Sequence, residues 1–325
     1  METIDGRYPF PRIAPPYRRG VREVVESVAD LETQSGLSAH VEMAGPGDDT
    51  EAPPALVDNV ETLANVARIL ARGAEWFRTE GTPESPGTIV CTVTGATRRS
   101  GVGEVIMGTP LREVIDLIGG GPRPGRSIRA VLPGVSNRFI DGSALDTPVS
   151  YEALAAIGSG LGSAGFIVFD DADDLVAVAA GVARFLAVES CGQCSPCKLD
   201  GLRMAELLDA ATRGEAVTND LDELRSRIAK VADGARCSLA TQQQVVAASL
   251  LEEFPADIAA HLERKAPPTT PYLVAELVDI DDDGVARVDE HHADKQPDWT
   301  FDRQDSGKTP AARLGEHREP QGLDE

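Results

Sequence analysis

Three of the five cysteines lie close together in the chain, at Cys191, Cys194 and Cys197. A spacing of two residues lets one loop turn several thiolates toward a common centre. A tetrahedral zinc site usually draws on two separated pairs of ligands, whereas a third cysteine two residues further along is typical of iron–sulfur ligation. The spacing therefore favours an iron–sulfur cluster over structural zinc or reduced thiols that bind nothing.

A four-iron cluster needs a fourth ligand, and only Cys91 and Cys237 remain. Cys237 lies between two predicted helices, a position that can return to the helix after Cys197. Cys91 lies on the apolar side of a predicted strand, and we interpret it as a small core residue. We therefore assign four cysteines to one [4Fe–4S] cluster: Cys191, Cys194, Cys197 and Cys237. With every iron capped, such a cluster transfers electrons and has no vacancy for a substrate.

Residues beside the cysteines suit this interpretation. Gly192 and Pro196 favour a tight loop whose backbone N–H groups point at the sulfurs, which tunes the potential of a cluster. Lys198 adds a positive charge that would favour the reduced, more negative state. A lysine on a solvated helix face is the alternative interpretation of Lys198.

Two further motifs point to more ordinary structure. Residues 160–165 match Gly-x-Gly-x-x-Gly, but they follow a helical pattern and precede a strand, the reverse of a dinucleotide-binding fingerprint, so we interpret them as a linker. The run from Asp279 to Glu290 has the acidic spacing of a calcium-binding loop. Its β-branched flank and Arg287 favour a β-hairpin instead. His291 and His292 are adjacent, and such exposed pairs usually bind nothing.

Composition narrows the class of protein. The net charge of −22 and pI of about 4.6 argue against binding to a phosphate backbone. The sequence contains no run of 18 or more apolar residues, so we expect no membrane span. The N-terminus lacks the apolar region of a secretory signal. Clustered cysteines in a reducing compartment more often hold metal than form disulfides, so we expect a cytoplasmic protein.

The elements that carry these residues follow from periodicity. Apolar residues at three–four spacing predict a helix over 56–77, with Gly73 near its end. A β-branched alternation follows, then short strands and a helix. Thr109 is the predicted N-cap of this helix, Pro110 its first residue, and Gly119 to Gly121 its end. Residues 171–263 show repeated helical patterns with short connections. The sequence predicts an α+β fold, a β-grasp domain followed by an α-helical bundle that carries the cluster.

We expect six segments along the chain. The tail is polar and charged, and it cannot bury enough apolar surface to offset its ordering entropy. The segments are an N-terminal irregular linker (1–55), a connecting helix (56–83), the β-grasp domain (84–170), the helical bundle (171–263), a β-hairpin extension (264–302) and a disordered tail (303–325).

Three stretches resemble one known family. ESCGQCSPCKLDG is similar to the ESCGxCxPCR-x-G signature of the F-type, NADH-oxidising flavoprotein subunit of respiratory complex I, a family that includes diaphorase subunits of NAD-linked hydrogenases and formate dehydrogenases. DNVETLANVARILARGAEWF resembles its NNVETL segment, and GEVIMGTPLREVIDLIGGG resembles the start of its soluble-ligand-binding β-grasp domain. The resemblance covers about residues 5–262, and Cys237 falls where the family places its fourth ligand.

The departures from the family concern the flavin. The family binds FMN and NADH through a Gly-Arg-Gly-Gly-Ala-Gly-Phe loop and a Gly-Glu-Glu motif, and neither occurs here. The resemblance thus implies that FMN and NADH are not bound by this chain alone, and that residues 1–55 begin with the remnant tail of the flavin domain. The phosphate-holding segment maps onto Asp58 and Asn59, where a carboxylate replaces an amide. Lys198 stands where the family usually has arginine.

The resemblance implies an electron-transfer subunit that relays single electrons within an NADH dehydrogenase-like complex. Its partners would be a flavin-carrying polypeptide and a second iron–sulfur subunit of the thioredoxin-like [2Fe–2S] type, in a complex peripheral to a membrane. We expect the isolated chain to be inactive with NADH. Two alternatives remain: a complete NADH:acceptor oxidoreductase subunit whose N-terminus is truncated, and a ligand-binding scaffold in which the cluster is structural.

Overall fold

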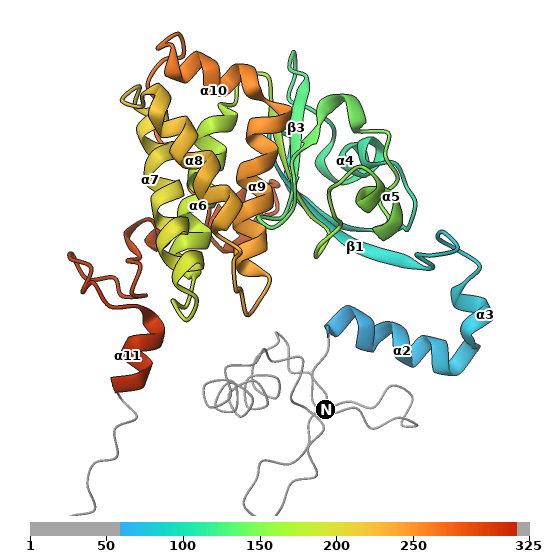
Figure 1. Cartoon of the computed structure of the whole chain (residues 1–325). Helices are drawn as coiled ribbons and strands as arrows, with labels where there is room; N and C mark the ends of the chain where they lie inside the picture. Colours follow the sequence, from blue (N-terminus) through green and yellow to red (C-terminus); the bar gives the residue numbers. More distant parts are fainter. Residues whose placement is uncertain (1–58, 317–325) are drawn as a thin grey trace, which may run out of the picture. The chain divides into compact units, whose positions relative to one another are not determined.

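The computed structural model describes residues 59–316 of the 325-residue chain. The chain divides into two compact units between Glu80 and Gly81. The described part of the first unit holds α2 (Val60–Arg72) and α3 (Ala74–Phe77), and the second unit holds all later elements (Figure 1). Over the described residues, no helix has both the length and the apolar character of a membrane span.

Helix α2 begins at a side-chain cap. The Asn59 side chain accepts hydrogen bonds from the Glu61 amide at 2.8 Å and the Thr62 amide at 3.3 Å, which satisfies two amides that have no partner within the helix. Gly73, with φ of +90°, ends α2, so the helix predicted over 56–77 is divided there. Asn59 is therefore used as a helix cap, while Asp58 lies outside the described residues.

The second unit contains a mixed five-stranded sheet in the order β2-β1-β5-β3-β4. Strand β1 pairs antiparallel with β2 and parallel with β5, and β3 pairs antiparallel with both β5 and β4. The β-branched alternation that predicted β1 gives it one fully buried face. The strands are β1 (Thr88–Gly95), β2 (Gly101–Ile106), β3 (Ile128–Pro133), β4 (Ile140–Asp141) and β5 (Gly165–Asp170).

One face of the sheet packs against α4 (Leu111–Gly119) and α5 (Tyr151–Ala156), with the 3₁₀ turn η1 (Gly142–Ala144) between them. Helix α4 ends at Gly120 in the left-handed conformation, as the run of glycines predicted. Its predicted N-cap is wrong: the Thr109 hydroxyl donates to the Ile106 carbonyl at 2.7 Å, and no side chain caps the helix.

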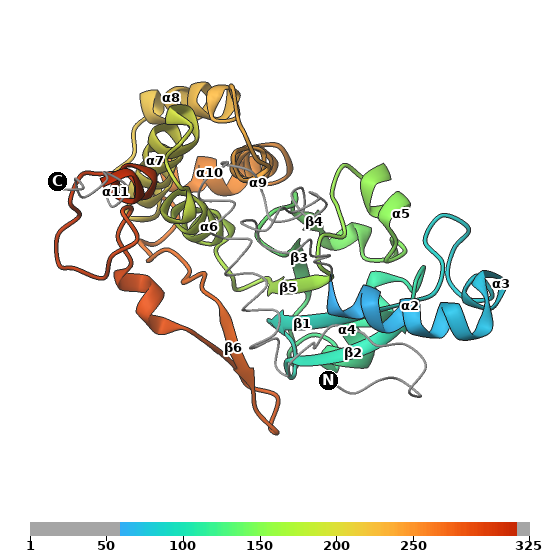
Figure 2. The ribbon, with the colours of Figure 1, turned by 90° about the horizontal axis from the view of Figure 1, so that it is seen from below.

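The opposite side of the sheet packs against a group of helices, as Figures 1 and 2 show. Buried side chains of β3 and β5 contact buried residues of α6 and α9 in one continuous core. Helix α6 is buried along most of its length because its sequence is almost wholly apolar. The helices are α6 (Leu175–Glu189), α7 (Gly201–Thr212), α8 (Thr218–Lys230), α9 (Leu239–Glu253) and α10 (Pro255–Leu262). The chain is thus an α+β protein with a mixed sheet.

The C-terminal extension contains a short antiparallel hairpin, β6 (Leu277–Ile280) and β7 (Ala286–Val288), followed by the 3₁₀ helix η3 (Glu290–Asp294). Helix α11 (Pro310–Glu316) follows, within the stretch that composition predicted to be disordered. This helix is not expected from composition because contacts with a distant segment, the end of α6, hold the extension in place. Residues 317–325 lie outside the described part.

Candidate metal centre

The three clustered cysteines lie where α6 ends and α7 begins. Cys191 and Cys194 are half-buried in the connecting loop, and Cys197 is 6% exposed within η2 (Pro196–Asp200), a π-helical turn that leads directly into α7. Gly192 has φ of +80°, a conformation that favours glycine. The predicted tight loop is present, and π-helical turns are often found at functional sites.

Cys237 lies in the connection between α8 and α9 and is exposed. Its neighbour Arg236 donates a hydrogen bond from Nη1 to the Gln193 side-chain oxygen at 2.9 Å, which brings this connection to the cysteine loop. Cys91 is fully buried within β1, in the core on the other side of the sheet. The structure therefore brings the α8–α9 connection, and not Cys91, to the three clustered cysteines.

The pKa of the Cys197 thiol is raised by its surroundings. Burial raises the pKa of the Cys197 thiol, and its hydrogen bond with the Ser190 hydroxyl, at 3.3 Å, opposes that rise. The three other thiols raise the same pKa further: Cys237, Cys194 and Cys191. These contributions indicate that the three other thiols lie on the same side of the molecule as Cys197.

The donor set fits an iron–sulfur cluster. Within residues 59–316, no three histidine, cysteine, aspartate or glutamate side chains stand close enough together to hold a single metal ion. A [4Fe–4S] cluster takes one thiolate at each iron. The cysteine loop carries three thiols, and the α8–α9 connection, joined to the loop by Arg236, carries a fourth at Cys237.

Lys198 is buried beneath the loop and is 2% exposed, so its alternative placement on a solvated helix face is wrong. Its ammonium donates to the carbonyl oxygens of Ala187 and Ser190, each at 2.9 Å, and of Val188 at 3.2 Å. These carbonyls lie at the C-terminal end of α6, where partners within the helix run out and a positive charge is favourable. Burial lowers the pKa of Lys198 to about 8.

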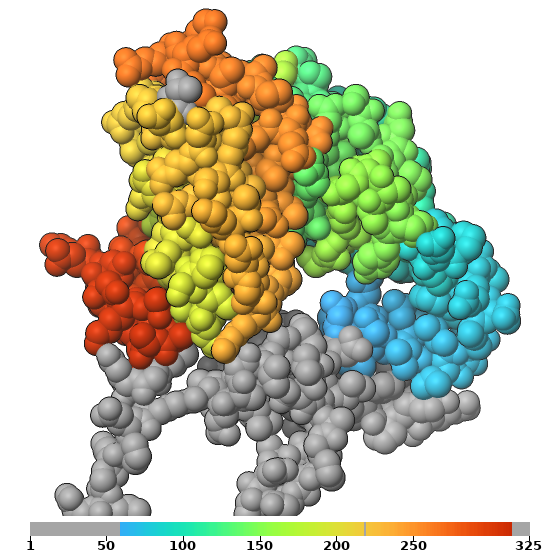
Figure 3. Space-filling view, viewed as in Figure 1, coloured from blue at the N-terminus to red at the C-terminus, as the bar shows by residue number. Residues whose placement is uncertain are grey.

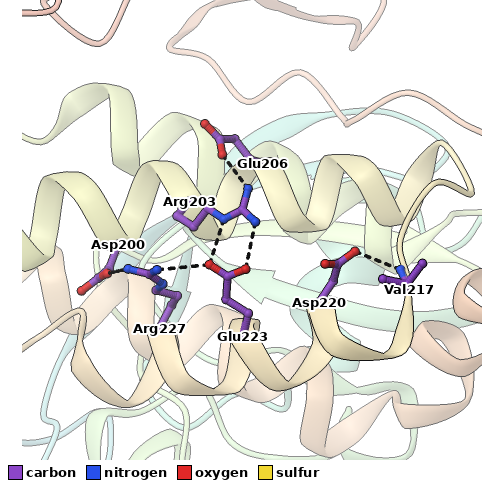
Figure 4. Close-up of polar contacts among 7 residues, drawn as sticks. All are labelled: Asp200, Arg203, Glu206, Val217, Asp220, Glu223 and Arg227. Carbon is purple, nitrogen blue, oxygen red and sulfur yellow. Dashed lines mark hydrogen bonds and ion pairs between the residues drawn. The ribbon is translucent and has the colours of Figure 1, made fainter.

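A polar network joins η2 to α7 and α8 (Figure 4). The Arg203 guanidinium forms two hydrogen bonds with Glu223, at 3.0 and 2.8 Å, and Arg227 bridges from Glu223 to Asp200 at 2.6 Å. These bonds, first those from Arg203, hold the pKa of Glu223 at about 2. Because Asp200 is the last residue of η2, the network fixes the turn that carries Cys197 against α8.

The C-terminal extension closes over the same loop. The Ala311 amide donates to the Cys191 carbonyl at 2.8 Å, and the Trp299 indole donates to the Val188 carbonyl at 2.9 Å. A Cβ added at Gly192 would lie 2.3 Å from the Thr309 Cβ, so the two segments are in close contact. Figure 3 shows this C-terminal segment, in red, against the yellow-green end of the helices.

Gln243 is a neighbour of the cysteines that sequence reasoning missed. It lies on α9, is 2% exposed, and directs its Nε2 to the Cys197 carbonyl at 3.0 Å and the Cys197 sulfur at 3.4 Å. A buried glutamine is unusual unless it is hydrogen-bonded. Its only signal in the sequence is its position, six residues after Cys237 within a run of three glutamines.

The aspartate run forms the predicted hairpin turn. The Asp281 carboxylate accepts hydrogen bonds from the amides of Asp283 and Val285, at 3.1 and 2.9 Å, and pairs with Arg287 at 3.2 Å. The carboxylate that would be a central calcium ligand is therefore occupied by the turn itself. His292 packs its ring against Phe185, with 4.9 Å between ring centres.

Residues 160–165 also have an ordinary structural role. They connect α5 to β5, which is the order that the sequence predicted. A Cβ added at Gly160 would lie 2.5 Å from the Asn137 side-chain oxygen. Any other residue at this position would displace the Asn137 side chain, so the glycine is explained by packing.

Comparison with known proteins gives consistent matches. The sequence profile of the NADH-ubiquinone oxidoreductase-F iron-sulfur binding region matches residues 177–261. The chain is 34% identical over 270 residues to an F-type subunit of the NADH-quinone oxidoreductase of Rhizobium meliloti (strain 1021), covering 82% of this chain and 58% of that protein. It is 39% identical over 216 residues to the HndC subunit of the NADP-reducing hydrogenase of Solidesulfovibrio fructosivorans, covering 66% and 44%.

Solved structures agree with these relatives. A crystal structure of NAD⁺-reducing [NiFe]-hydrogenase in the H₂-reduced state matches with a TM-score of 0.61 and 28% identity, over 73% of this chain and 40% of that one. The chain spans about half the length of the curated relatives it matches. The matched region includes all four assigned cysteines. The chain belongs to the family of F-type subunits of NADH-quinone oxidoreductases and related hydrogenase subunits, and it carries their 4Fe–4S-binding region.

Proposed function

We propose that four cysteines hold the [4Fe–4S] cluster of this region: Cys191, Cys194, Cys197 and Cys237. The hydrogen bond between Arg236 and Gln193 carries this assignment, because it joins the α8–α9 connection to the cysteine loop. The effect of the three other thiols on the pKa of Cys197 supports the same set.

The chain would serve as an electron-transfer subunit of an NADH dehydrogenase-like complex. A [4Fe–4S] cluster with four thiolate ligands supplies reversible one-electron transfer. The residues around the cysteine loop would support electron transfer by holding the loop in place. Lys198 holds the end of α6 beneath the loop, and the α7–α8 network holds η2, so both ends of the loop are fixed. Exposed Cys237 would place one edge of the cluster near the surface, where a partner can approach.

The partners follow from the family resemblance. Relatives are named as subunits of NADH-quinone oxidoreductases and of an NADP-reducing hydrogenase, so this chain is expected to work within an assembly. We infer that a flavin-carrying polypeptide delivers electrons and that a thioredoxin-like [2Fe–2S] subunit is a second partner. A cytoplasmic location, at the periphery of a membrane complex, belongs to the same proposal.

We also infer a β-grasp type for the sheet with α4 and α5. The order of its elements supports this: a β1–β2 hairpin, then α4, then β3, with β5 returning to the centre of the sheet, parallel to β1. The segment boundaries proposed from the sequence, at 84–170 for this domain and 171–263 for the helical part, are retained as part of the inference.

Cysteine variants test the ligand set. After anaerobic reconstitution of the full chain, we expect about four iron and four sulfide per chain. Cys237→Ala should lose most of the iron, whereas the matched control Cys91→Ala should keep it, because Cys91 lies in the sheet core. Cluster loss in Cys91→Ala together with retention in Cys237→Ala would show that the fourth ligand has been assigned wrongly.

The relay is tested with the same preparation. We expect dithionite to reduce the cluster and ferricyanide to reoxidise it, with an electron paramagnetic resonance signal in the reduced state only. We expect no NADH–ferricyanide activity from the isolated chain. Sustained NADH oxidation would contradict the relay and favour a complete NADH:acceptor oxidoreductase.

A further inference from the structure

Gln243 is a buried polar side chain that is hydrogen-bonded to a cysteine sulfur. It projects from α9, the helix that follows Cys237, and reaches the turn that carries Cys197. Its Nε2 lies 3.0 Å from the Cys197 carbonyl oxygen and 3.4 Å from the Cys197 sulfur. A side-chain amide nitrogen carries two hydrogens, so one nitrogen can serve both acceptors.

The orientation of the amide follows from its neighbours. A carbonyl oxygen and a thiolate are both acceptors, so the end of the Gln243 amide that faces them must be the NH₂ group. The other end, Oε1, is buried and has no hydrogen-bond partner among the described residues. Turning the amide around would set an oxygen against two acceptors, which would be unfavourable at both contacts.

Gly201 makes room for this orientation. A Cβ at Gly201 would lie 1.9 Å from the Gln243 Oε1, so any other residue at this position would displace the Gln243 amide. A residue with no side chain, at the first position of α7, thus allows a glutamine to reach the cysteine turn.

The neighbouring glutamines differ. Gln244 donates to the Ile228 carbonyl at 2.7 Å, within the contact of α9 with α8. Gln242 directly precedes Gln243 in the sequence, so its side chain leaves α9 in another direction, and it is half-buried. The middle glutamine is hydrogen-bonded to a cysteine, and its burial would be costly without the bonds that it makes there.

We propose that Gln243 donates a hydrogen bond to the Cys197 thiolate and so raises the reduction potential of the cluster. This inference rests on the proposed [4Fe–4S] ligation. Reduction adds one electron, and therefore one negative charge, to the cluster and its thiolates, without making or breaking a bond. An N–H donor stabilises the more negative state more strongly, and hydrogen bonds to sulfur are a recognised determinant of cluster potential.

The test compares two adjacent substitutions in the reconstituted full chain. Gln243→Met keeps the side-chain length and removes both donors, and Gln242→Met is the matched control. The midpoint potential is measured by anaerobic titration with redox mediators, followed by electron paramagnetic resonance. Gln243→Met should lower the equilibrium constant for reduction about tenfold, which corresponds to about 59 mV for a one-electron couple. Gln242→Met should leave it unchanged.

The outcomes separate this inference from the proposed function. A Gln243→Met protein that holds a full cluster at the wild-type potential overturns the inference and leaves the relay intact. A wild-type chain that binds no cluster overturns the relay itself. If Gln243→Met does not load, wild-type protein labelled with ¹⁵N in the glutamine side-chain amides decides the question by pulsed resonance. A ¹⁵N coupling to the reduced cluster that persists in Gln193→Glu, which keeps an acceptor for Arg236 but has no side-chain nitrogen, supports the bond. The absence of that coupling overturns it.

Discussion

Replacing Lys198 by methionine tests whether a buried charge holds the cysteine loop in place. Three hydrogen bonds from a charged donor contribute about 1.5–3 kcal/mol each. Burial of the ammonium, reflected in the pKa of about 8, costs roughly 3 kcal/mol against an ordinary value of 10.5. The difference is a net stabilisation of about 2–6 kcal/mol. The Val188 carbonyl keeps its bond from Trp299, so the loss falls on the carbonyls of Ala187 and Ser190.

Urea unfolding followed by circular dichroism measures this change, with Lys230→Met as the matched control. Lys230 is exposed in the last turn of α8, so its loss should cost less than about 0.5 kcal/mol. A local readout is available as well. The Ser190 amide donates to the Leu186 carbonyl at 3.0 Å, the last such bond of α6, and its hydrogen exchange should accelerate in Lys198→Met.

The result that refutes this reasoning is a Lys198→Met protein as stable as the Lys230→Met control, with an unchanged exchange rate at Ser190. The carbonyls of Ala187 and Ser190 would then be satisfied by water, and the end of α6 would hold its shape without the ammonium. The cysteine loop would in that case depend on its contacts with α8 and with the C-terminal extension.

Two further predictions concern other parts of the fold. Gly192→Ala should lower the free energy of unfolding by about 1–3 kcal/mol, and by more than Gly214→Ala does. Both glycines have positive φ, but of the two only Gly192 would place a methyl group against the Thr309 side chain. Urea titrations of the two variants measure the difference. Glu152 has its pKa lowered to about 2 by hydrogen bonds, first from Ser85. The stability that the ionised Glu152 contributes to the fold should be complete above pH 4.5 and lost as the pH falls toward 2. The difference in free energy of unfolding between the wild-type protein and Glu152→Gln should therefore shrink over that range in acid titrations. A constant difference would contradict this prediction.

Patterns among neighbouring residues predicted the strand β1 and the end of helix α4. The alternation at residues 88–95 is present as β1 because one of its faces is buried against α4. The glycines after residue 118 do end α4, since a left-handed residue is needed there. The N-cap at Thr109 was mistaken because a hydroxyl can bond to either side of a turn, and here it turns back to Ile106. The composition of residues 303–316 also gave no sign of α11.

The cysteine triplet of the candidate site can be identified from the sequence, whereas the residues that surround it cannot. Two-residue spacing identifies a loop that can wrap a cluster, so the triplet at residues 191–197 could be found without a structure. The partners of that loop come from distant parts of the chain, and no local pattern marks them. Lys198 resembles an ordinary surface lysine until α6 is seen to end above it. Gln243 and Gly201 are 42 residues apart, and each explains the other only in three dimensions.

The distribution of these contacts bears on how the site forms. The loop is held by α6 through Lys198, by α9 through Gln243, by the α8–α9 connection through Arg236, and by the C-terminal extension through Ala311. None of these contacts is available to an isolated loop peptide, and all require the helices to be packed first. Short spacing alone would allow the thiolates many arrangements in an unfolded chain. The packed helices restrict these arrangements, so we expect the fold to limit how the thiolates can be placed when a cluster binds.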